Sequence, residues 1–364
     1  MRVKLGHLPS ELKQAILRHL NWEDLSTMCL VSRCWRKEAE DPKLWEDFGK
    51  LFNWSVEPIS SHKELKTVLQ MKRFQALKHI AIHEKFSFSE SSLQLLLDQN
   101  LVSLDLRYCN LDSAPSDLLT TLLAGLEIIK LRGSIKNSCM VELFTKLKAS
   151  NKLKNLNWLS GDYTCLDPSL LASVLSRLDC GNWDYSTRCF TPTQWEHLFS
   201  AIAARDKPMK WINFDSTRLT YVSPGVLARG LGNVETLNLQ YTYLTKEQVT
   251  EFFTLISMSG SRIKKLDFSW EGSNQGKVDP TVLASAVNKL EDVCFGYSRL
   301  QPSQIEAILL GVDANSTLKS LDLRSGWTFV CDGNQAAGEE EKNWKTTTLA
   351  PLLVKARKHC EVLI

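Results

Sequence analysis

Long apolar runs are missing from this 364-residue chain, and none approaches the ~20 residues that a membrane-spanning helix needs. The first residues lead into a polar helix rather than the apolar core of a signal peptide, so we expect neither secretion nor membrane insertion. An excess of one charge is also missing, because 44 Lys and Arg face 41 Asp and Glu, for a net charge of +3. This balance argues against a nucleic-acid or membrane-surface protein. The expected location is the cytoplasm, and a nuclear location is also open.

Closely spaced cysteine pairs are lacking as well. The ten cysteines are scattered with no C-x-x-C pair, which predicts free thiols in a reducing compartment, no metal and no other cofactor. His79 and His83 are four apart, but they fall in a predicted strand and its exit rather than on one helix face. A P-loop, a G-x-S-x-G motif and a zinc-hydrolase pair are absent, so we expect no enzyme.

A repeated pattern runs through most of the chain. L-x-x-L-x-L, with other apolar residues allowed, begins at ten positions whose spacing ranges from 22 to 34 residues with a mean near 27. A leucine-rich repeat is ~20–29 residues long. We attribute the longest interval, 175–209, to a loop insertion. The ten starts are Leu77, Leu101, Leu126, Leu153, Leu175, Met209, Val234, Ile263, Leu290 and Leu318.

The rest of each unit agrees with this pattern. Four copies continue to a small polar residue and then leucine, and Cys109, Thr217, Thr242 and Ser298 at this position can hydrogen-bond the turn backbone. Amphipathic helices are expected between the strands. The predicted helices include Ser91–Asp98, Met140–Lys148, Pro168–Arg177, Thr193–Ala204, Lys246–Ser257, Pro280–Lys289 and Pro302–Gly311.

These units predict an α/β fold, a right-handed leucine-rich-repeat solenoid (horseshoe) of about ten strand–helix repeats. The strands line the concave face and the helices the convex face. One unit cannot bury its own apolar side, so stacking of neighbours supplies the core.

The first fifty residues do not repeat. Leu8-Pro9 precede a helix with apolar residues at spacings of three and four, a second helix follows Asn21, and a third ends before Asp41-Pro42. Three helices this short bury little area, and they would gain stability by packing on a partner.

Positions 8–45 resemble an F-box. The matching residues, in register and without a gap, are Leu8-Pro9-x-Glu11, Ile16-Leu17-x-x-Leu20, Asp24-Leu25, Val31-Ser32-x-x-Trp35-Arg36, Ala39 and Asp41-Pro42-x-Leu44-Trp45. With the repeats behind it, the whole chain resembles an F-box/leucine-rich-repeat protein.

That resemblance implies a substrate-recognition adaptor of a cullin–RING (SCF-type) E3 ubiquitin ligase. It would be non-catalytic: the F-box binds a Skp-type adaptor and through it a cullin, and the repeats bind a protein substrate for ubiquitylation. By motif position, the implied adaptor contacts are Leu8, Pro9, Ile16, Leu20, Leu25, Val31, Trp35 and Trp45.

The implied domains are an F-box at 1–50, a packed linker or N-terminal cap at 51–76, leucine-rich repeats at 77–330, and an acidic loop with a C-terminal capping helix at 331–364. The alternative is a non-ligase leucine-rich-repeat scaffold or inhibitor that binds a protein partner and uses its first fifty residues as an end cap.

Two features of the repeats are candidates for substrate binding. Arg107, Lys130 and Arg132 form a basic cluster on the concave face, opposed by Asp105, and could accept a phosphorylated or acidic peptide. Aromatic residues just past the strands could form a row along one rim, or could pack over the neighbouring turn instead. The candidate contacts are Arg107, Tyr108, Lys130, Arg132, Trp183, Tyr185, Trp211, Tyr241, Trp270, Tyr297 and Trp327.

Overall fold

The structure is a computed structural model, and it divides into two compact units, Met1–Leu153 and Lys154–Ile364. Strands alternate with helices in both units, so the predicted α/β architecture is confirmed. The residues that the structure describes are 8–20, 28, 33–39, 41, 62–70, 78–82, 86, 88–107, 109, 111, 114–132, 135–159, 163–183, 190–258, 260–269, 277–312, 316–324 and 337–364.

The first unit holds the N-terminal helices and the first repeats. Its strands pair in parallel in chain order, with Ile80 opposite Leu104 and Leu104 opposite Ile129. The described elements are α1 (Ser10–Leu17), α3 (Arg33–Ala39), α6 (His62–Gln70), β1 (His79–Ala81), α7 (Glu90–Leu97), β2 (Ser103–Leu106), α8 (Ser116–Ala124), β3 (Ile128–Arg132) and α9 (Asn137–Ser150).

The second unit continues the same alternation, and its strands also pair in parallel in chain order. Its described strands are β4 (Asn155–Leu159), β5 (Cys180–Asn182), β6 (Met209–Asn213), β7 (Val234–Asn238), β8 (Lys265–Asp267), β9 (Asp292–Cys294), β10 (Ser320–Asp322) and β11 (Glu361–Leu363). Its described helices are α10 (Pro168–Leu175), α11 (Pro192–Ala203), α12 (Pro224–Gly232), α13 (Lys246–Ser257), α14 (Pro280–Val287), α15 (Pro302–Gly311), α16 (Ala337–Trp344), the π-helical turn η4 (Lys345–Leu349) and α17 (Ala350–Ala356).

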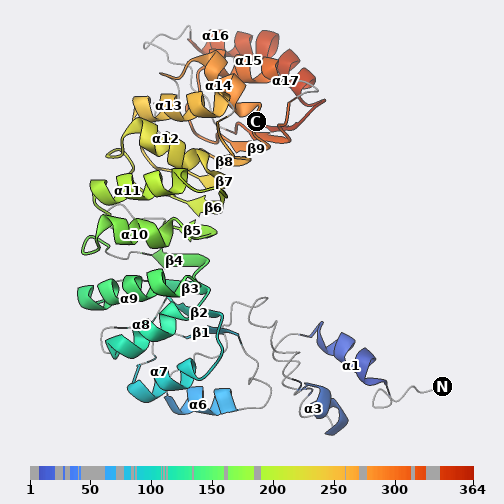
Figure 1. Ribbon diagram of the computed structural model, residues 1–364. Helices are drawn as coiled ribbons and strands as arrows, with labels where there is room; N and C mark the ends of the chain where they lie inside the picture. The colour runs from blue at the N-terminus through green and yellow to red at the C-terminus, as the bar shows by residue number, and fades with distance from the viewer. Residues whose placement is uncertain are drawn as a thin grey trace, which may run out of the picture. The chain divides into compact units, whose positions relative to one another are not determined.

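The core of the second unit lies between its helices and its strands. Figure 1 shows α10 to α15 side by side along one face, with β4 to β9 along the other. Leucine, isoleucine, valine and phenylalanine fill the space between them, as in Phe252 and Phe268, whose rings stack at 6.3 Å. Each repeat therefore depends on its neighbour for a closed core, as the sequence pattern predicts.

Two kinds of hydrogen bond fasten the turns between strand and helix. The predicted small polar residue of each turn donates to a backbone carbonyl, which confirms the role expected for it. The donors and acceptors are Cys109 Sγ to Ile82 O at 3.2 Å, Thr217 Oγ1 to Trp183 O at 2.7 Å, Thr242 Oγ1 to Leu239 O at 2.8 Å, and Ser298 Oγ to Phe295 O. Burial, together with the charge of Asp105, raises the pKa of the Cys109 thiol to about 12, so this cysteine stays protonated.

The second kind of hydrogen bond comes from a buried glutamine at the third position of α11, α13 and α15. The sequence pattern did not predict it. Gln248 of α13 donates from Nε2 to the carbonyls of Leu219 and Val222 in the preceding repeat, at 2.8 and 2.7 Å. Its Oε1 also accepts from the N–H of Thr245, which closes a capping box. Gln194 makes the same set of bonds in α11, and one amide thus ties a helix start to the turn before it.

The register of the fifth strand differs from the prediction. The pattern placed this repeat at Leu175, but Gly181 stands opposite both Leu156 and Ile212, so the repeat begins three residues later, at Leu178. Both leucines are buried, but only Leu175 fits the pattern in full, because Gly181 stands where a repeat that begins at Leu178 would need an apolar residue. The interval to the next start is correspondingly 31 residues rather than 34.

The chain end contributes one more strand than expected. The sequence predicts only an acidic loop and a capping helix for 331–364, whereas β11 follows α17 and pairs with β10, with Val362 opposite Leu321. Helix ends otherwise agree closely, and α13 and α15 have the predicted bounds.

Candidate functional site

Helix α1 presents an exposed apolar stripe. Leu12 and Ile16, four residues apart on one face, are 53% and 41% exposed. The other face buries Leu17, while the Gln14 side chain donates to the Asp41 carboxylate at 2.9 Å, beyond the end of α3. Polar anchoring on one side therefore leaves the apolar stripe on the other side open to a partner.

The predicted adaptor contacts are placed unequally along this segment. Pro9 and Ile16 are exposed, and Leu8 and Leu20 are partly exposed. Trp35 of α3 is only 5% exposed, so its indole is core in this structure rather than a contact surface, a correction to the motif-based assignment. Leu12 is a further exposed apolar residue that the motif does not include, although its spacing to Ile16 is a sequence signal for it. Three further predicted contacts lie outside the described residues: Leu25, Val31 and Trp45.

The basic cluster of the first unit is partly neutralised by one carboxylate. Arg107 forms a two-pronged ion pair with Asp105, whose Oδ2 is 2.8 Å from the guanidinium, and Lys130 lies 3.8 Å from the same carboxylate. Arg132 is exposed at the end of β3. Asp105 thus engages two of the three predicted cations and leaves Arg132 outside its network, and because one carboxylate offsets only one positive charge, the cluster keeps a net positive charge.

The strand face over β5 to β7 is lined by amides. Asn182, Asn213 and Asn238 stand opposite one another in successive strands, and the Nδ2 of Asn213 donates to the Oδ1 of Asn182 at 2.8 Å. The side chains of Asn213 and Asn238 also accept the N–H two residues on, an Asx turn that ends each strand. The half-buried Trp211 lies on this face opposite Cys180, so it remains a candidate contact.

Carboxylates replace the amides on the same face from β8 onwards, and those of Asp292 and Asp322 form ion pairs. Lys265 Nζ is 2.5 Å from the Asp292 carboxylate, and Arg324 is 2.6 Å from that of Asp322. The hydrogen bond from Arg324 holds the pKa of Asp322 below its usual value, and the hydrogen bond with Asp292 raises the pKa of Lys265. This part of the face is polar but carries little uncompensated charge.

The predicted aromatic row divides into buried and exposed members. Trp183 is fully buried and packs 5.4 Å from the Phe214 ring, so it belongs to the core and not to a substrate surface. Tyr163 is equally buried, stacked on Phe190 at 4.7 Å. Tyr297, in contrast, is 47% exposed, and Tyr241 is half-buried. Four predicted members lie outside the described residues: Tyr108, Tyr185, Trp270 and Trp327.

Two more exposed tyrosines and two arginines complete this rim, and of the tyrosines only Tyr221 was not expected in the aromatic row. Tyr221 and Tyr243 are each 57% exposed, and the Arg218 guanidinium lies 5.4 Å from the centre of the Tyr221 ring. Arg299 occupies the same place in its turn as Arg218, between the small polar residue and the leucine. That shared place in the repeat is the sequence signal that could have identified both arginines.

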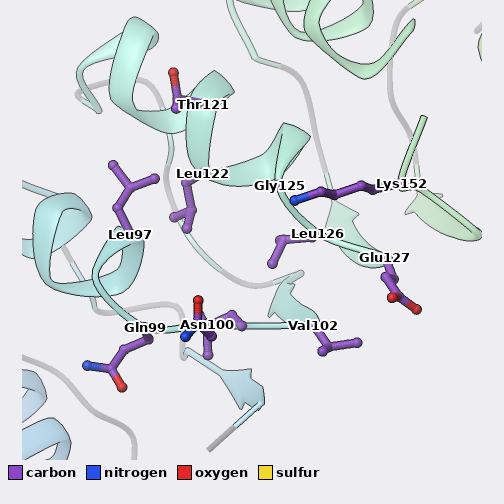
Figure 2. A pocket seen from close by; sticks show the side chains of 11 residues that line it. Leu97, Gln99, Asn100, Val102, Thr121, Leu122, Gly125, Leu126, Glu127 and Lys152 are labelled. Atoms are coloured by element: carbon purple, nitrogen blue, oxygen red, sulfur yellow. The ribbon is translucent and has the colours of Figure 1, made fainter. Parts of the chain in front are cut away.

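A pocket of about 380 Å³ lies in the first unit, where α7 and α8 end. Figure 2 shows Leu97, Leu122 and Leu126 around it, with the Lys152 side chain extending toward Gly125 at the end of α8. A cation near a helix C-terminus is favoured by the helix dipole, so Lys152 has a structural explanation there. The pocket lining contains no cysteine, histidine or paired acid that points to chemistry.

Residues 5–49 match the F-box-like family. The N-terminal segment is an F-box-like domain. No curated protein matches the chain in sequence. A crystal structure of a TLR13–ssRNA13 complex is similar over 70% of this chain at 15% identity, with a TM-score of 0.39. This chain spans 37% of the length of that protein.

The described residues can also be searched for disulfides, metal sites and membrane-spanning helices. Six cysteines of the described ranges are free thiols: Cys109, Cys139, Cys165, Cys180, Cys294 and Cys360. Within the described ranges, no group of three or more His, Cys, Asp or Glu is placed to hold a metal ion. None of the helices in these ranges combines the length and apolar character needed to cross a bilayer.

Proposed function

We propose that this chain is the substrate-recognition adaptor of a cullin–RING (SCF-type) E3 ubiquitin ligase. Its F-box-like domain, residues 1–50 in this proposal, binds a Skp-type adaptor and through it a cullin. The repeats, at 77–330, bind a protein substrate for ubiquitylation. F-box proteins are generally non-catalytic, so the chain acts by holding the substrate near a separate enzyme, where effective concentration drives the transfer.

The observation that carries this proposal is the exposed apolar stripe of α1 within the F-box-like match. Leu12 and Ile16 sit among solvent-exposed neighbours on the described part of α1, and burying these two half-exposed side chains against a partner stabilises a complex by about 1.5–3 kcal/mol. An end cap, the alternative role of this segment, needs an apolar face only toward the first repeat. The stripe is therefore better explained by a partner.

Co-purification with a recombinant Skp-type adaptor tests the proposal. The wild-type chain should form a stable one-to-one complex. The double variant Leu12→Asp/Ile16→Asp should bind at least about 30-fold more weakly, because two carboxylates would replace the apolar contacts. The control is Glu11→Ala/Arg18→Ala, which changes two exposed polar residues of the same helix and should bind as the wild type does.

The outcomes separate the two candidate functions. Equal binding by the wild type and the aspartate variant would show that α1 is not the contact and would contradict the proposal. No complex from a wild-type protein with a folded circular-dichroism spectrum would favour the non-ligase scaffold. Leu8→Ala/Pro9→Ala provides a milder second variant, since both residues precede the helix and contribute little to its packing.

A further inference from the structure

We propose that the rim of the second unit, formed by the turns after β6, β7 and β9, binds an extended acidic segment of a protein partner. The surface consists of Arg218 and Tyr221, Tyr241 and Tyr243, and Tyr297 and Arg299, and we call it the Tyr/Arg rim. The inference rests on the proposed function, because it assigns the substrate-binding surface of the repeats and the charge of the segment that fits it.

The rim combines exposure with a rigid support. Tyr221, Tyr243 and Tyr297 are about half-exposed, and Arg218 and Arg299 are exposed as well. The turn backbones are hydrogen-bonded to each other beyond the strands, for instance from Ser216 N to Gln240 O at 2.9 Å and from Tyr297 N to Arg324 O at 3.2 Å. Tyrosine and arginine are the residue types enriched at the energetic centres of protein interfaces.

The backbone conformation makes these side chains unusual. Tyr241, Tyr243, Tyr297 and Arg299 have φ values of 52°, 53°, 62° and 57°, in the left-handed region. Bulky residues are uncommon there, and the turn would accept glycine or asparagine with less strain. Large aromatic and cationic side chains are therefore present where the local geometry favours small ones, which points to a use for the side chains themselves.

The charge of the rim specifies the partner. Neither Arg218 nor Arg299 has a carboxylate partner among the described residues, and Arg218 contacts the Tyr221 ring instead. The described stretches 214–221, 239–244 and 295–300 contain one carboxylate, Asp215, which accepts a hydrogen bond from Ser216 at 2.9 Å. The situation is the reverse of the first unit, where Asp105 already neutralises Arg107. The guanidinium groups of the rim are thus available to external carboxylates.

The spacing of the turns specifies the length of the segment. The turn that carries Arg218 and the turn that carries Arg299 are separated by three strand steps, β6 to β7, β7 to β8 and β8 to β9. At about 4.8 Å per step, the two arginines lie about 14 Å apart along the rim, which about four residues of extended chain span. Two acidic residues about four apart, with an aromatic or aliphatic residue between them for Tyr243, would fit this surface.

Selection from a displayed library of random peptides of about twelve residues tests the inference on the full chain. We expect the selected peptides to be enriched in Asp and Glu over the input library, with two acidic positions about four residues apart. Binding of a selected synthetic peptide, measured by fluorescence anisotropy, should weaken at least tenfold in Arg218→Glu/Arg299→Glu. It should also weaken at least threefold in Tyr243→Ala, which leaves the charge unchanged. Arg229→Glu, an exposed arginine on α12, is the matched control and should bind as the wild type does.

Salt dependence gives a readout that needs no variant. Affinity of the wild-type chain for the peptide should fall steadily between low and high NaCl concentrations, because exposed ion pairs are screened. Selected peptides without acidic enrichment, salt-independent binding, or equal affinity for the wild type and the charge-reversed variant would each overturn the inference. The peptide assay contains no Skp-type adaptor. If the peptide assay fails but the chain still co-purifies with the Skp-type adaptor, the Tyr/Arg rim is refuted and the proposed function still stands.

Discussion

Replacement of Gly181 in β5, and of Trp183 just after this strand, by leucine tests the packing of the second unit most directly. In the other repeats the equivalent of Gly181 is a larger apolar residue, as in its register neighbours Leu156 and Ile212. A Cβ atom on Gly181 would lie 2.7 Å from Cζ2 of Trp183, closer than any ordinary contact. Trp183 is fully buried and packs on Phe214, so its ring has no room to retreat. Gly181 and Trp183 therefore share one volume.

Both single variants should destabilise the protein, and the double variant should cost no more than Trp183→Leu alone. Gly181→Leu forces a side chain into the space of the indole and should destabilise by about 3 kcal/mol. Trp183→Leu leaves a cavity above the glycine and should cost about 2 kcal/mol. The double variant recreates the pair found in repeat seven, Leu237 and Leu239, and should cost about 2 kcal/mol in all. The coupling free energy of the cycle is then about 3 kcal/mol in favour of the double variant.

Urea unfolding of the four proteins, followed by far-UV circular dichroism, measures the cycle. Trp211→Leu is the matched control. This half-buried tryptophan lies on the amide-lined strand face of β6, so its replacement should destabilise the protein less than Trp183→Leu does. Additivity of the two single variants within about 0.5 kcal/mol would refute the reasoning, since it would mean that the two side chains do not share a volume.

Gln248→Leu should lower the free energy of unfolding by about 3 kcal/mol in urea denaturation, because two buried carbonyls of the preceding turn lose their donor and the capping box opens; an effect below about 1 kcal/mol would contradict the bonding. Gly230→Ala should reduce the melting temperature, because the new Cβ would lie 2.8 Å from the backbone oxygen and the ring of Phe199 in α11. Gly225→Ala meets only the flexible Arg229 side chain, so this variant should leave the melting temperature unchanged or raise it. The opposite order of the two melting temperatures would contradict the packing of α12. The lowered pKa of Asp322 stabilises the fold above its unfolded-state pKa, and this contribution is lost as the pH falls below about 4. Stability curves of Arg324→Ala should therefore show a smaller loss between pH 5 and 3 than those of the wild type, and an unchanged loss would contradict this assignment.

The repeat architecture was predictable because apolar residues recur along the chain with the spacing of strands and helices. A strand that buries every second residue and a helix that buries every third or fourth leave a pattern that survives variation in individual residues. Helix α13 accordingly has the predicted bounds, and Thr242 makes the turn hydrogen bond expected from its position. The apolar spacing of α1 was equally visible in the sequence, and the F-box-like match covers it.

The sequence by itself determined that strands and helices alternate, that the turns are closed by small polar side chains, and that the first helices form a separate motif. Only the tertiary structure decided which aromatic residues are core and which are surface, because Trp183 and Tyr243 both follow a strand in the sequence. A missing side chain at Gly181 admits the first of these rings into the core, whereas a left-handed backbone at Tyr243 accompanies the exposure of the second. The charge of the basic cluster was decided in the same way, since the pairing of Arg107 with Asp105 depends on side-chain geometry that spacing does not contain.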